Sequence, residues 1–273
     1  MMELRTENLV VGYDKAPLIK DVNLKVVSGQ VLTLIGPNGA GKSTILKTIT
    51  RQLKRIGGTI YLGQESMNNM RDSEVSKRLS MVMTERLQTE LLTGRDVVAS
   101  GRYPYTGRFG ILAKEDWEKG DEAIALVHAQ DVQDQDFRKM SDGQRQRLML
   151  ARAICQDTDI LLLDEPTSYL DMGFKLDILA NIRMLARERN LAIIMSLHEL
   201  DLAQKVSDTI ACVKGDHIDR IGTPEEIFSG DYVQQLYGVT ETAFDPVTGE
   251  VFLQGAKSEP KVFVIGGCGS GIA

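Results

Sequence analysis

The stretch VLTLIGPNGAGKSTILKTI, residues 31–49, joins an apolar run of strand length to a helical pattern through a glycine-rich segment. Residues 36–44 match G-x-x-x-x-G-K-[ST], the pattern of a loop whose backbone N–H groups surround nucleotide phosphates. The helix that follows adds its positive N-terminal end to this site. The pattern predicts a strand, a phosphate loop and a helix whose Ile45, Ile49 and Leu53 lie on one face.

Residues 36–44, called the phosphate loop below, are expected to bind ATP. Lys42 contributes a positive charge to the β- and γ-phosphates, and the Ser43 hydroxyl is a ligand for Mg²⁺. Tyr13, at the end of the first predicted strand, is expected to stack on adenine, with packing in the core as the alternative. The predicted loop residues are Gly36, Pro37, Asn38, Gly39, Ala40, Gly41, Lys42, Ser43 and Thr44.

A second apolar run, ILLLDE at residues 160–165, ends in two adjacent carboxylates. Side chains alternate along a strand, so Asp164 and Glu165 point in different directions. Asp164 is suited to coordinate Mg²⁺, directly or through water, while Glu165 orients and activates the attacking water. His198 follows another apolar run, which ends on the same edge of a parallel sheet as the loop. We therefore predict that Lys42, Glu165 and His198 are catalytic.

Composition limits the classes of protein to which the chain can belong. It has 273 residues and a net charge of −6, and its pI of about 5.3 argues against nucleic acid as a partner, because a phosphate-binding face usually raises the pI. No apolar run approaches the roughly 18 residues of a membrane helix, and the start of the chain lacks a signal-peptide layout. Cys155, Cys212 and Cys268 lie far apart, which favours reduced thiols over a zinc site or disulfides.

Apolar runs of strand type alternate with helical patterns along most of the chain. This alternation predicts a mainly parallel sheet into which a polar helical block, at about residues 86–150, is inserted. Residues 1–240 are assigned to one domain, and residues 241–273 to a hairpin around Asp245–Gly249 followed by a glycine-rich tail. The tail lacks the helix that a dinucleotide site requires, so we expect a flexible tail or a chain cut short of a further domain.

The segment MSDGQRQRLMLARA, residues 140–153 and called the signature segment below, predicts a second anion site. A serine and a glycine precede a long helical pattern, and the free N–H groups of a helix N-terminus bind anions. The alternative is that Ser141 only caps its own helix. Both interpretations can hold, because a cap oxygen accepts from a single N–H.

Four features follow one another along the chain: the phosphate loop, the signature segment, LLLDEPTSYLD at residues 161–171, and His198. Over about residues 3–240 the chain resembles the ATP-binding subunit of an ABC transporter. The resemblance implies an α/β fold, a P-loop NTPase of ABC type with a mainly parallel sheet core, an antiparallel β subdomain and an inserted α-helical subdomain. It also implies ATP and Mg²⁺ as cofactors and ATP hydrolysis as the activity.

The resemblance further implies that two copies pack head to tail as a homodimer with shared ATP sites. In this arrangement Ser141, Gly143 and Gln144 of one copy face the ATP held by the other. The loop at residues 168–171 resembles the dimer-contact loop of the family, with Asp171 toward the partner.

The family has a glutamine near the start of the helical subdomain that senses Mg²⁺ and the membrane subunit. At that position this chain has Thr84 or Glu85, with Gln88 slightly beyond. A carboxylate could reach the metal through water, so Glu85 is the predicted third metal residue beside Ser43 and Asp164.

Residues 97–112, VVASGRYPYTGRFGIL, are similar to the matching region of subunits that drive uptake of iron–siderophore complexes, haem or cobalamin. The resemblance implies a location on the cytoplasmic face of the cell membrane, integral membrane permease subunits as partners and a solute-binding protein as an indirect partner. The alternative is a soluble ABC-type ATPase that acts on nucleic acid or ribosomes. Such proteins usually carry long coiled-coil insertions or a second ATPase unit, and neither is found in this sequence.

Overall fold

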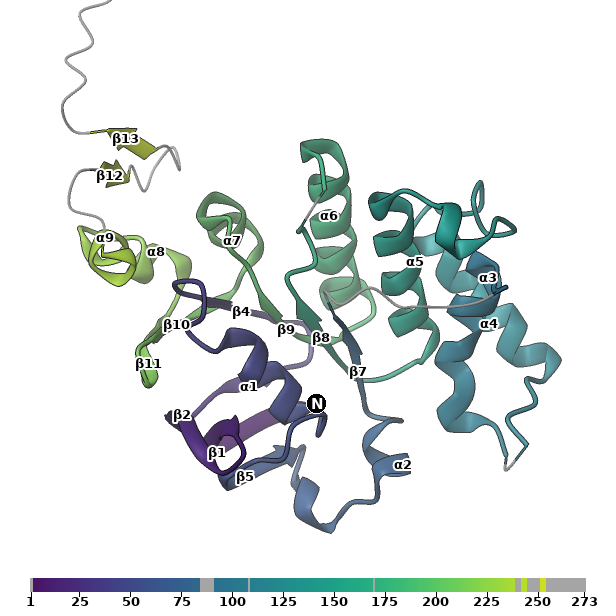
Figure 1. Cartoon of the computed structure of the whole chain (residues 1–273), viewed down its shortest axis with the longest axis horizontal. Coiled ribbons are helices and arrows are strands. Elements are labelled where there is room, and N and C mark those ends of the chain that lie inside the picture. Colours follow the sequence, from purple (N-terminus) through teal and green to yellow (C-terminus); the bar gives the residue numbers. More distant parts are fainter. Residues whose placement is uncertain are drawn as a thin grey trace, which may run out of the picture.

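A six-stranded sheet runs through the middle of the molecule in the computed structural model (Figure 1). The structure describes residues 2–83, 91–107, 109–168, 170–238, 242–244 and 251–253, and every structural statement below concerns these residues. Neighbouring strands are parallel, except where β11 pairs with β10. The strand order is β11 (His217–Gly222), β10 (Thr209–Lys214), β4 (Val31–Ile35), β9 (Ala192–Ser196), β8 (Ile160–Asp164) and β7 (Leu79–Val82).

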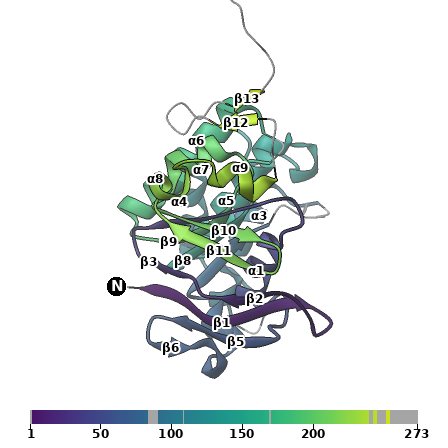
Figure 2. The ribbon, with the colours of Figure 1, turned by 90° about the vertical axis from the view of Figure 1, so that its left-hand side faces the viewer.

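A smaller antiparallel sheet lies below the main sheet, with helix α1 (Lys42–Ile49) between the two (Figure 2). Its longest strand alternates between buried and more exposed residues, and Leu9 and Val11 share a core cluster with Ile45 of α1. This alternation is typical of an antiparallel sheet with one face in the core. Its strands are β1 (Glu3–Tyr13), β2 (Ala16–Val22), β3 (Lys25–Val27), β5 (Gly57–Leu62) and β6 (Glu65–Ser66).

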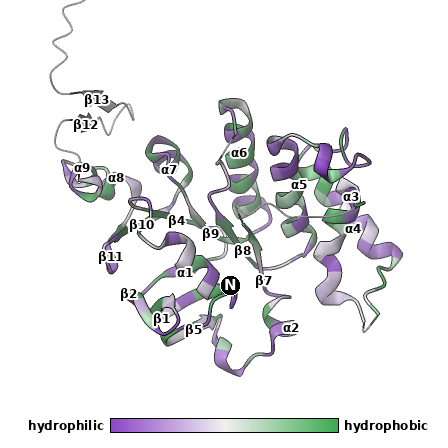
Figure 3. Ribbon diagram, in the orientation of Figure 1, coloured by the Kyte–Doolittle hydropathy of each residue, from purple (hydrophilic) through white to green (hydrophobic). Residues whose placement is uncertain are grey.

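Both faces of the main sheet are covered, because its central strands are apolar on both sides. Leu32 and Leu34 of β4 belong to the core cluster that contains α1, whereas Val31 and Ile35 belong to the cluster with the helices of the opposite face. Figure 3 shows these central strands as hydrophobic. Burial of each such side chain stabilises the fold by about 1.5–3 kcal/mol.

Helix α1 is shorter than the sequence pattern predicts. It ends at Ile49, Thr50 is its C-cap, and Leu53 lies beyond it. The chain turns at Arg51, which has φ 62°, and the Arg51 guanidinium pairs with Asp72 at 2.6 Å. The prediction of a helical face through Leu53 is therefore wrong, because contacts with a segment distant in sequence accompany the end of the helix.

A block of helices is inserted between β7 and β8 and occupies the right-hand side of Figure 1. Its helices contact one another, and a buried ion pair joins Arg102 to Asp116 at 3.0 Å. The helix α5 that carries the signature segment continues to Cys155. The elements are α3 (Gly94–Ala99), the 3₁₀ turn η2 (Ser100–Tyr105), α4 (Lys114–Leu126), the 3₁₀ turn η3 (Phe137–Lys139) and α5 (Asp142–Cys155).

The remaining helices are α2 (Asp72–Val75), which follows the 3₁₀ turn η1 (Met67–Asn69), and α6 (Met172–Glu188), α7 (Leu200–Val206), α8 (Pro224–Ile227) and α9 (Tyr232–Tyr237). β12 (Thr242–Phe244) pairs antiparallel with β13 (Val251–Leu253), and the turn predicted between them lies outside the described residues. No helix in the described part of the chain has the length and apolar character needed to cross a membrane. The predicted fold class, a mainly parallel core with an antiparallel sheet and a helical region, is confirmed.

Candidate nucleotide site

The phosphate loop connects the end of β4 to the start of α1. Gly36, Gly39 and Gly41 have φ angles of 145°, 78° and 93°, which L side chains rarely adopt. A Cβ on Gly36 would lie 2.2 Å from the Val213 carbonyl oxygen. Gly41 is the N-cap of α1 and has no side chain to cap the helix, so the first N–H groups of α1 are left for an anion.

The Lys42 side chain is buried inside the loop. Its Nζ donates hydrogen bonds to the carbonyl oxygens of Gly36 at 2.7 Å and Pro37 at 3.1 Å. Burial lowers the pKa of Lys42 below its ordinary value, although the carboxylates of Glu165 and Asp164 act in the opposite direction. The ammonium group thus lies where phosphate oxygens would be held.

Asp164 ends β8 beside the phosphate loop. Its Oδ1 accepts hydrogen bonds from Ser43 Oγ at 2.9 Å and from Ser196 Oγ at 2.7 Å. Asp164 is buried, so its carboxylate and the Ser43 hydroxyl are fixed side by side. These two oxygen donors fit Mg²⁺, which is usually bound through one or two carboxylates together with substrate phosphates.

Glu165 points away from Asp164, as expected for adjacent residues at the end of a strand. One carboxylate oxygen is hydrogen-bonded to His198 Nε2, and the other accepts from Ser168 Oγ at 2.9 Å. The backbone has φ 48° at Glu165, and its N–H donates to Ser196 Oγ at 2.9 Å. The structure therefore brings Glu165 and His198 together at the edge of the sheet where the loop lies.

Two residues that the sequence analysis did not identify organise this edge. Ser196 joins the Asp164 carboxylate to the Glu165 backbone. Glu199 accepts hydrogen bonds from Thr167 Oγ1 at 3.0 Å and Lys175 Nζ at 2.5 Å. Burial raises the pKa of Glu199, but these hydrogen bonds outweigh it and lower the pKa overall. The only sequence signal for both was their position next to His198 at the end of a predicted strand.

Tyr13 lies at the end of β1 and is 52% exposed. Its hydroxyl is 3.2 Å from Thr44 Oγ1, so the ring is next to the phosphate loop. An exposed aromatic ring at this point is available to a flat base, and the adenine-stacking role stays a prediction.

The signature segment contains the start of α5 and supplies the cap of this helix. Gln144 N–H donates to Ser141 Oγ at 3.3 Å, and Ser141 N–H donates to Gln144 Oε1 at 2.9 Å, which is a capping box. Gly143 is buried next to the Phe174 ring of α6. Ser141 thus caps its own helix, which is one of the two roles predicted for it.

The structure of a single copy does not bring the signature segment to the phosphate loop. In Figure 1, α5 lies on one side of β8 and α6, and α1 lies on the other. Gln146 Nε2 donates to the Pro166 carbonyl oxygen at 3.2 Å, which joins α5 to the turn after Glu165. Asp171, predicted to face a partner, accepts from Phe174 N–H at 3.1 Å and caps α6. The predicted sensor positions Thr84, Glu85 and Gln88 lie outside the described residues.

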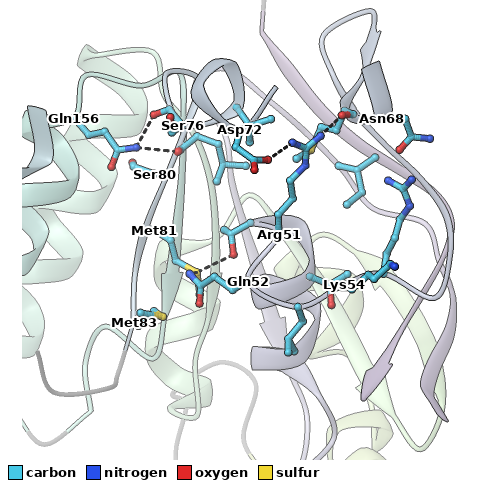
Figure 4. Close-up of a pocket in the computed structure, with 18 of the residues that line it drawn as sticks. Arg51, Gln52, Lys54, Asn68, Asp72, Ser76, Ser80, Met81, Met83 and Gln156 are labelled. Atoms are coloured by element: carbon cyan, nitrogen blue, oxygen red, sulfur yellow. Dashed lines mark hydrogen bonds and ion pairs between the residues drawn. The ribbon is translucent and has the colours of Figure 1, made fainter. Parts of the chain in front are cut away.

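A cleft of about 1100 Å³ lies between the end of α1, α2, β7 and the end of α5 (Figure 4). Met81 and Met83 line it on one side, and Lys54 lies on another. Arg152 also lines the cleft; its Nε donates to Ser100 Oγ at 3.0 Å, and burial lowers its pKa. The cleft therefore combines adaptable apolar side chains with basic groups, away from the phosphate loop.

The sequence model of the ABC transporter family matches residues 19–168. The chain belongs to the ABC transporter family. It is 40% identical over 272 residues to an ABC transporter ATP-binding protein of Methanocaldococcus jannaschii, covering 98% of this chain and 93% of that protein. It is 34% identical over 249 residues to the iron(3+)-hydroxamate import ATP-binding protein FhuC of Bacillus subtilis, covering 91% and 93%.

A solved structure described as an inward-facing ABC transporter of the metal-chelate type has the same fold. Its TM-score is 0.78 at 22% identity, covering 93% of this chain and 96% of that one. The ABC transporter ATPase predicted from the motifs, with ATP as its nucleotide, is thereby confirmed.

Proposed function

We propose that this ABC ATPase works as a homodimer that energises the import of iron–siderophore complexes, haem or cobalamin. The observation that carries the hydrolytic part is the Glu165 carboxylate, held between His198 and Ser168 beside the phosphate loop. A carboxylate oriented by two donors at the edge of a γ-phosphate site is placed to direct water in line.

Catalysis rests on positioning and charge. The loop N–H groups and Lys42 hold the triphosphate, and the Lys42 ammonium exchanges its contacts with loop carbonyls for phosphate oxygens. Glu165 orients the water and takes up its proton, while His198 keeps the carboxylate in place and lies at the γ-phosphate end. Tyr13 stacks on the base.

Ser43 and Asp164 would hold Mg²⁺, since their oxygens lie 2.9 Å apart and are partly buried. The ion supplies positive charge that neutralises the β- and γ-phosphates when bound. Glu85 would complete this set through water.

The second half of each ATP site comes from the other copy. Ser141, Gly143 and Gln144 lie at a helix N-terminus that the phosphate loop of the same copy does not reach, so their anion site is available to a partner's γ-phosphate. The contacts of Gln146 with Pro166 and of Phe174 with Gly143 then join the two ATP sites through one chain.

The cleft between α1, α2, β7 and α5 is the surface for an integral membrane permease. Its basic side chains Lys54, Arg55 and Arg152 suit a cytoplasmic loop that carries carboxylates, and Met81 and Met83 suit apolar side chains of that loop. This contact would hold the subunit at the cytoplasmic face of the membrane, with a solute-binding protein bound only to the permease.

The importer assignment is supported by relatives such as FhuC, an iron(3+)-hydroxamate import protein. The experiment that separates it from a soluble ATPase is purification of the tagged chain with its native partners in mild detergent. An integral membrane permease as the stable partner supports import, whereas ribosomes or DNA overturn it.

The hydrolytic role of Glu165 is tested with Glu165→Gln. The amide cannot take the proton of water, so turnover should fall about 10²–10⁴-fold while ATP still binds and a dimer accumulates on gel filtration. Turnover close to that of the unmodified chain would refute the role of Glu165.

A further inference from the structure

Helix α9 reaches the phosphate loop from the far end of the chain. It covers Tyr232–Tyr237 and ends at Gly238, which has φ 66°. The Tyr237 hydroxyl accepts a hydrogen bond from the Gly36 N–H at 3.0 Å, across 201 residues of sequence. This contact is made by the first residue of the loop, which is buried.

The Gly36 peptide is constrained on several sides. A Cβ on Gly36 would lie 2.2 Å from the Val213 carbonyl oxygen. The Gly36 carbonyl oxygen accepts a hydrogen bond from Lys42 Nζ at 2.7 Å. The next residue, Pro37, has no N–H, so the Gly36 amide is the last backbone donor before the loop turns. Gly36 is buried, and a buried N–H without a partner is unfavourable.

Tyr237 is held in one place by the packing of α9. Val233 and Leu236 are buried in the core cluster, and Tyr237 packs against that cluster. Burial raises the pKa of Tyr237 to about 12, so its hydroxyl stays neutral. Five residues earlier on the same helix, Tyr232 donates to Asp219 Oδ2 of β11 at 2.7 Å.

We propose that Tyr237 is a positioning residue for ATP binding, and this inference rests on the nucleotide site proposed above. Its hydroxyl fixes the Gly36 amide, and through it the direction in which the phosphate loop leaves β4. Tyr237 is not placed to touch ATP. The contact therefore sets how well the loop is ordered before the phosphates arrive, and has no part in the chemical step.

The test is Tyr237→Phe, which keeps the ring and its packing but removes the acceptor. We expect the Kd of the monomer for a fluorescent ATP analogue, and the KM for ATP, to rise about five- to tenfold while kcat stays within about twofold. A merely structural role would lower the thermal midpoint without moving KM relative to kcat.

Tyr232→Phe is the matched control, because it removes a tyrosine hydroxyl from the same helix that does not touch the loop. It should lower the thermal midpoint and leave ATP affinity unchanged. Unchanged affinity in Tyr237→Phe, or an equal loss in both variants, would overturn the proposal. If the unmodified chain neither binds nor splits ATP, the proposed function itself fails, which is a separate result.

A measurement on the unmodified chain covers the case in which Tyr237→Phe does not fold. Hydrogen exchange at the Gly36 amide should be slow in the nucleotide-free protein, because the Tyr237 hydroxyl occupies that donor. Exchange at the rate of an exposed loop amide would contradict the contact.

Discussion

The phosphate loop and the signature segment both lead through glycine into a helix, yet the two helix starts are built differently. At the start of α1 the N-cap is Gly41, which leaves the helix N–H groups without a side-chain cap. At the start of α5 the N-cap is Ser141, and its capping box with Gln144 satisfies both residues internally. The start of α1 has no side-chain cap, whereas the start of α5 is capped and leaves only its other N–H groups for an anion.

The difference indicates which helix start binds phosphate first. The phosphate loop has a buried lysine and a fixed pair of oxygen ligands at Ser43 and Asp164, so it recognises a triphosphate alone. The signature segment has no lysine equivalent to Lys42, and it offers only the helix N–H groups that its cap does not use. We therefore expect it to add to a site already occupied, which is the role of a partner copy.

The largest effect is expected from removal of the positive charge of Lys42 in the phosphate loop. Lys42→Ala takes away the charge that faces the phosphates, so ATP affinity should fall on the order of 100-fold, or about 2.8 kcal/mol. Titration of the monomer with a fluorescent ATP analogue measures this. The exposed Lys114→Ala should bind ATP normally, and a Lys42 variant that did the same would refute the assignment.

The loss of stability caused by an added methyl group should differ between the phosphate loop and the signature segment. Gly36→Ala would place a Cβ 2.2 Å from the Val213 carbonyl oxygen, at φ 145°, whereas Gly143→Ala would meet the Phe174 ring at 3.2 Å. We expect about 2 kcal/mol or more of destabilisation for the first and less than about 1 kcal/mol for the second. Urea unfolding gives both values, and equal losses would contradict the distinction.

Ser141→Ala tests the signature segment by itself, because it should affect turnover and not the binding of ATP to the monomer. We expect the rate of hydrolysis to fall about tenfold, the loss of one charge-assisted hydrogen bond to phosphate. ATP affinity of the monomer should not change. Thr93→Ala is the control, since Thr93 caps α3 with the same kind of box and each cap is worth about 1 kcal/mol. Failure of Ser141→Ala to bind ATP as a monomer would assign the signature to its own copy's site.

The smallest effect is the dependence of ATP affinity on pH, which tests the buried lysine of the phosphate loop. The free Lys42 has a pKa below its ordinary 10.5, and bound phosphates favour its charged form, so ATP binding takes up a proton as the site titrates. Affinity should therefore fall as pH rises through the free pKa, by at most about tenfold per pH unit. Calorimetry over a series of pH values below 10.5, in buffers of different ionisation enthalpy, measures the proton uptake. Lys42→Arg should abolish the dependence, because arginine stays charged; a dependence that survived would belong to another group.

The fold and part of the site could be predicted from the sequence, because the patterns that indicate them lie within short stretches of the chain. Continuous apolar runs predicted the buried strands β4, β8 and β9, and the fold class is confirmed. The helical face through Leu53 was wrong, because the Arg51–Asp72 contact is not visible in a local pattern. Ser196 and Tyr237 were missed for the same reason, since each gains its role from a residue more than thirty positions away.

The phosphate loop could be predicted from local sequence, because its glycines, its lysine and the helix after it act within a few residues of one another. Tertiary structure alone decided that Asp164 meets Ser43, that Glu165 meets His198, and that Tyr237 meets Gly36. These pairs depend on the order of strands in the sheet and on where α9 packs, and both are set by burial of apolar surface over the whole chain.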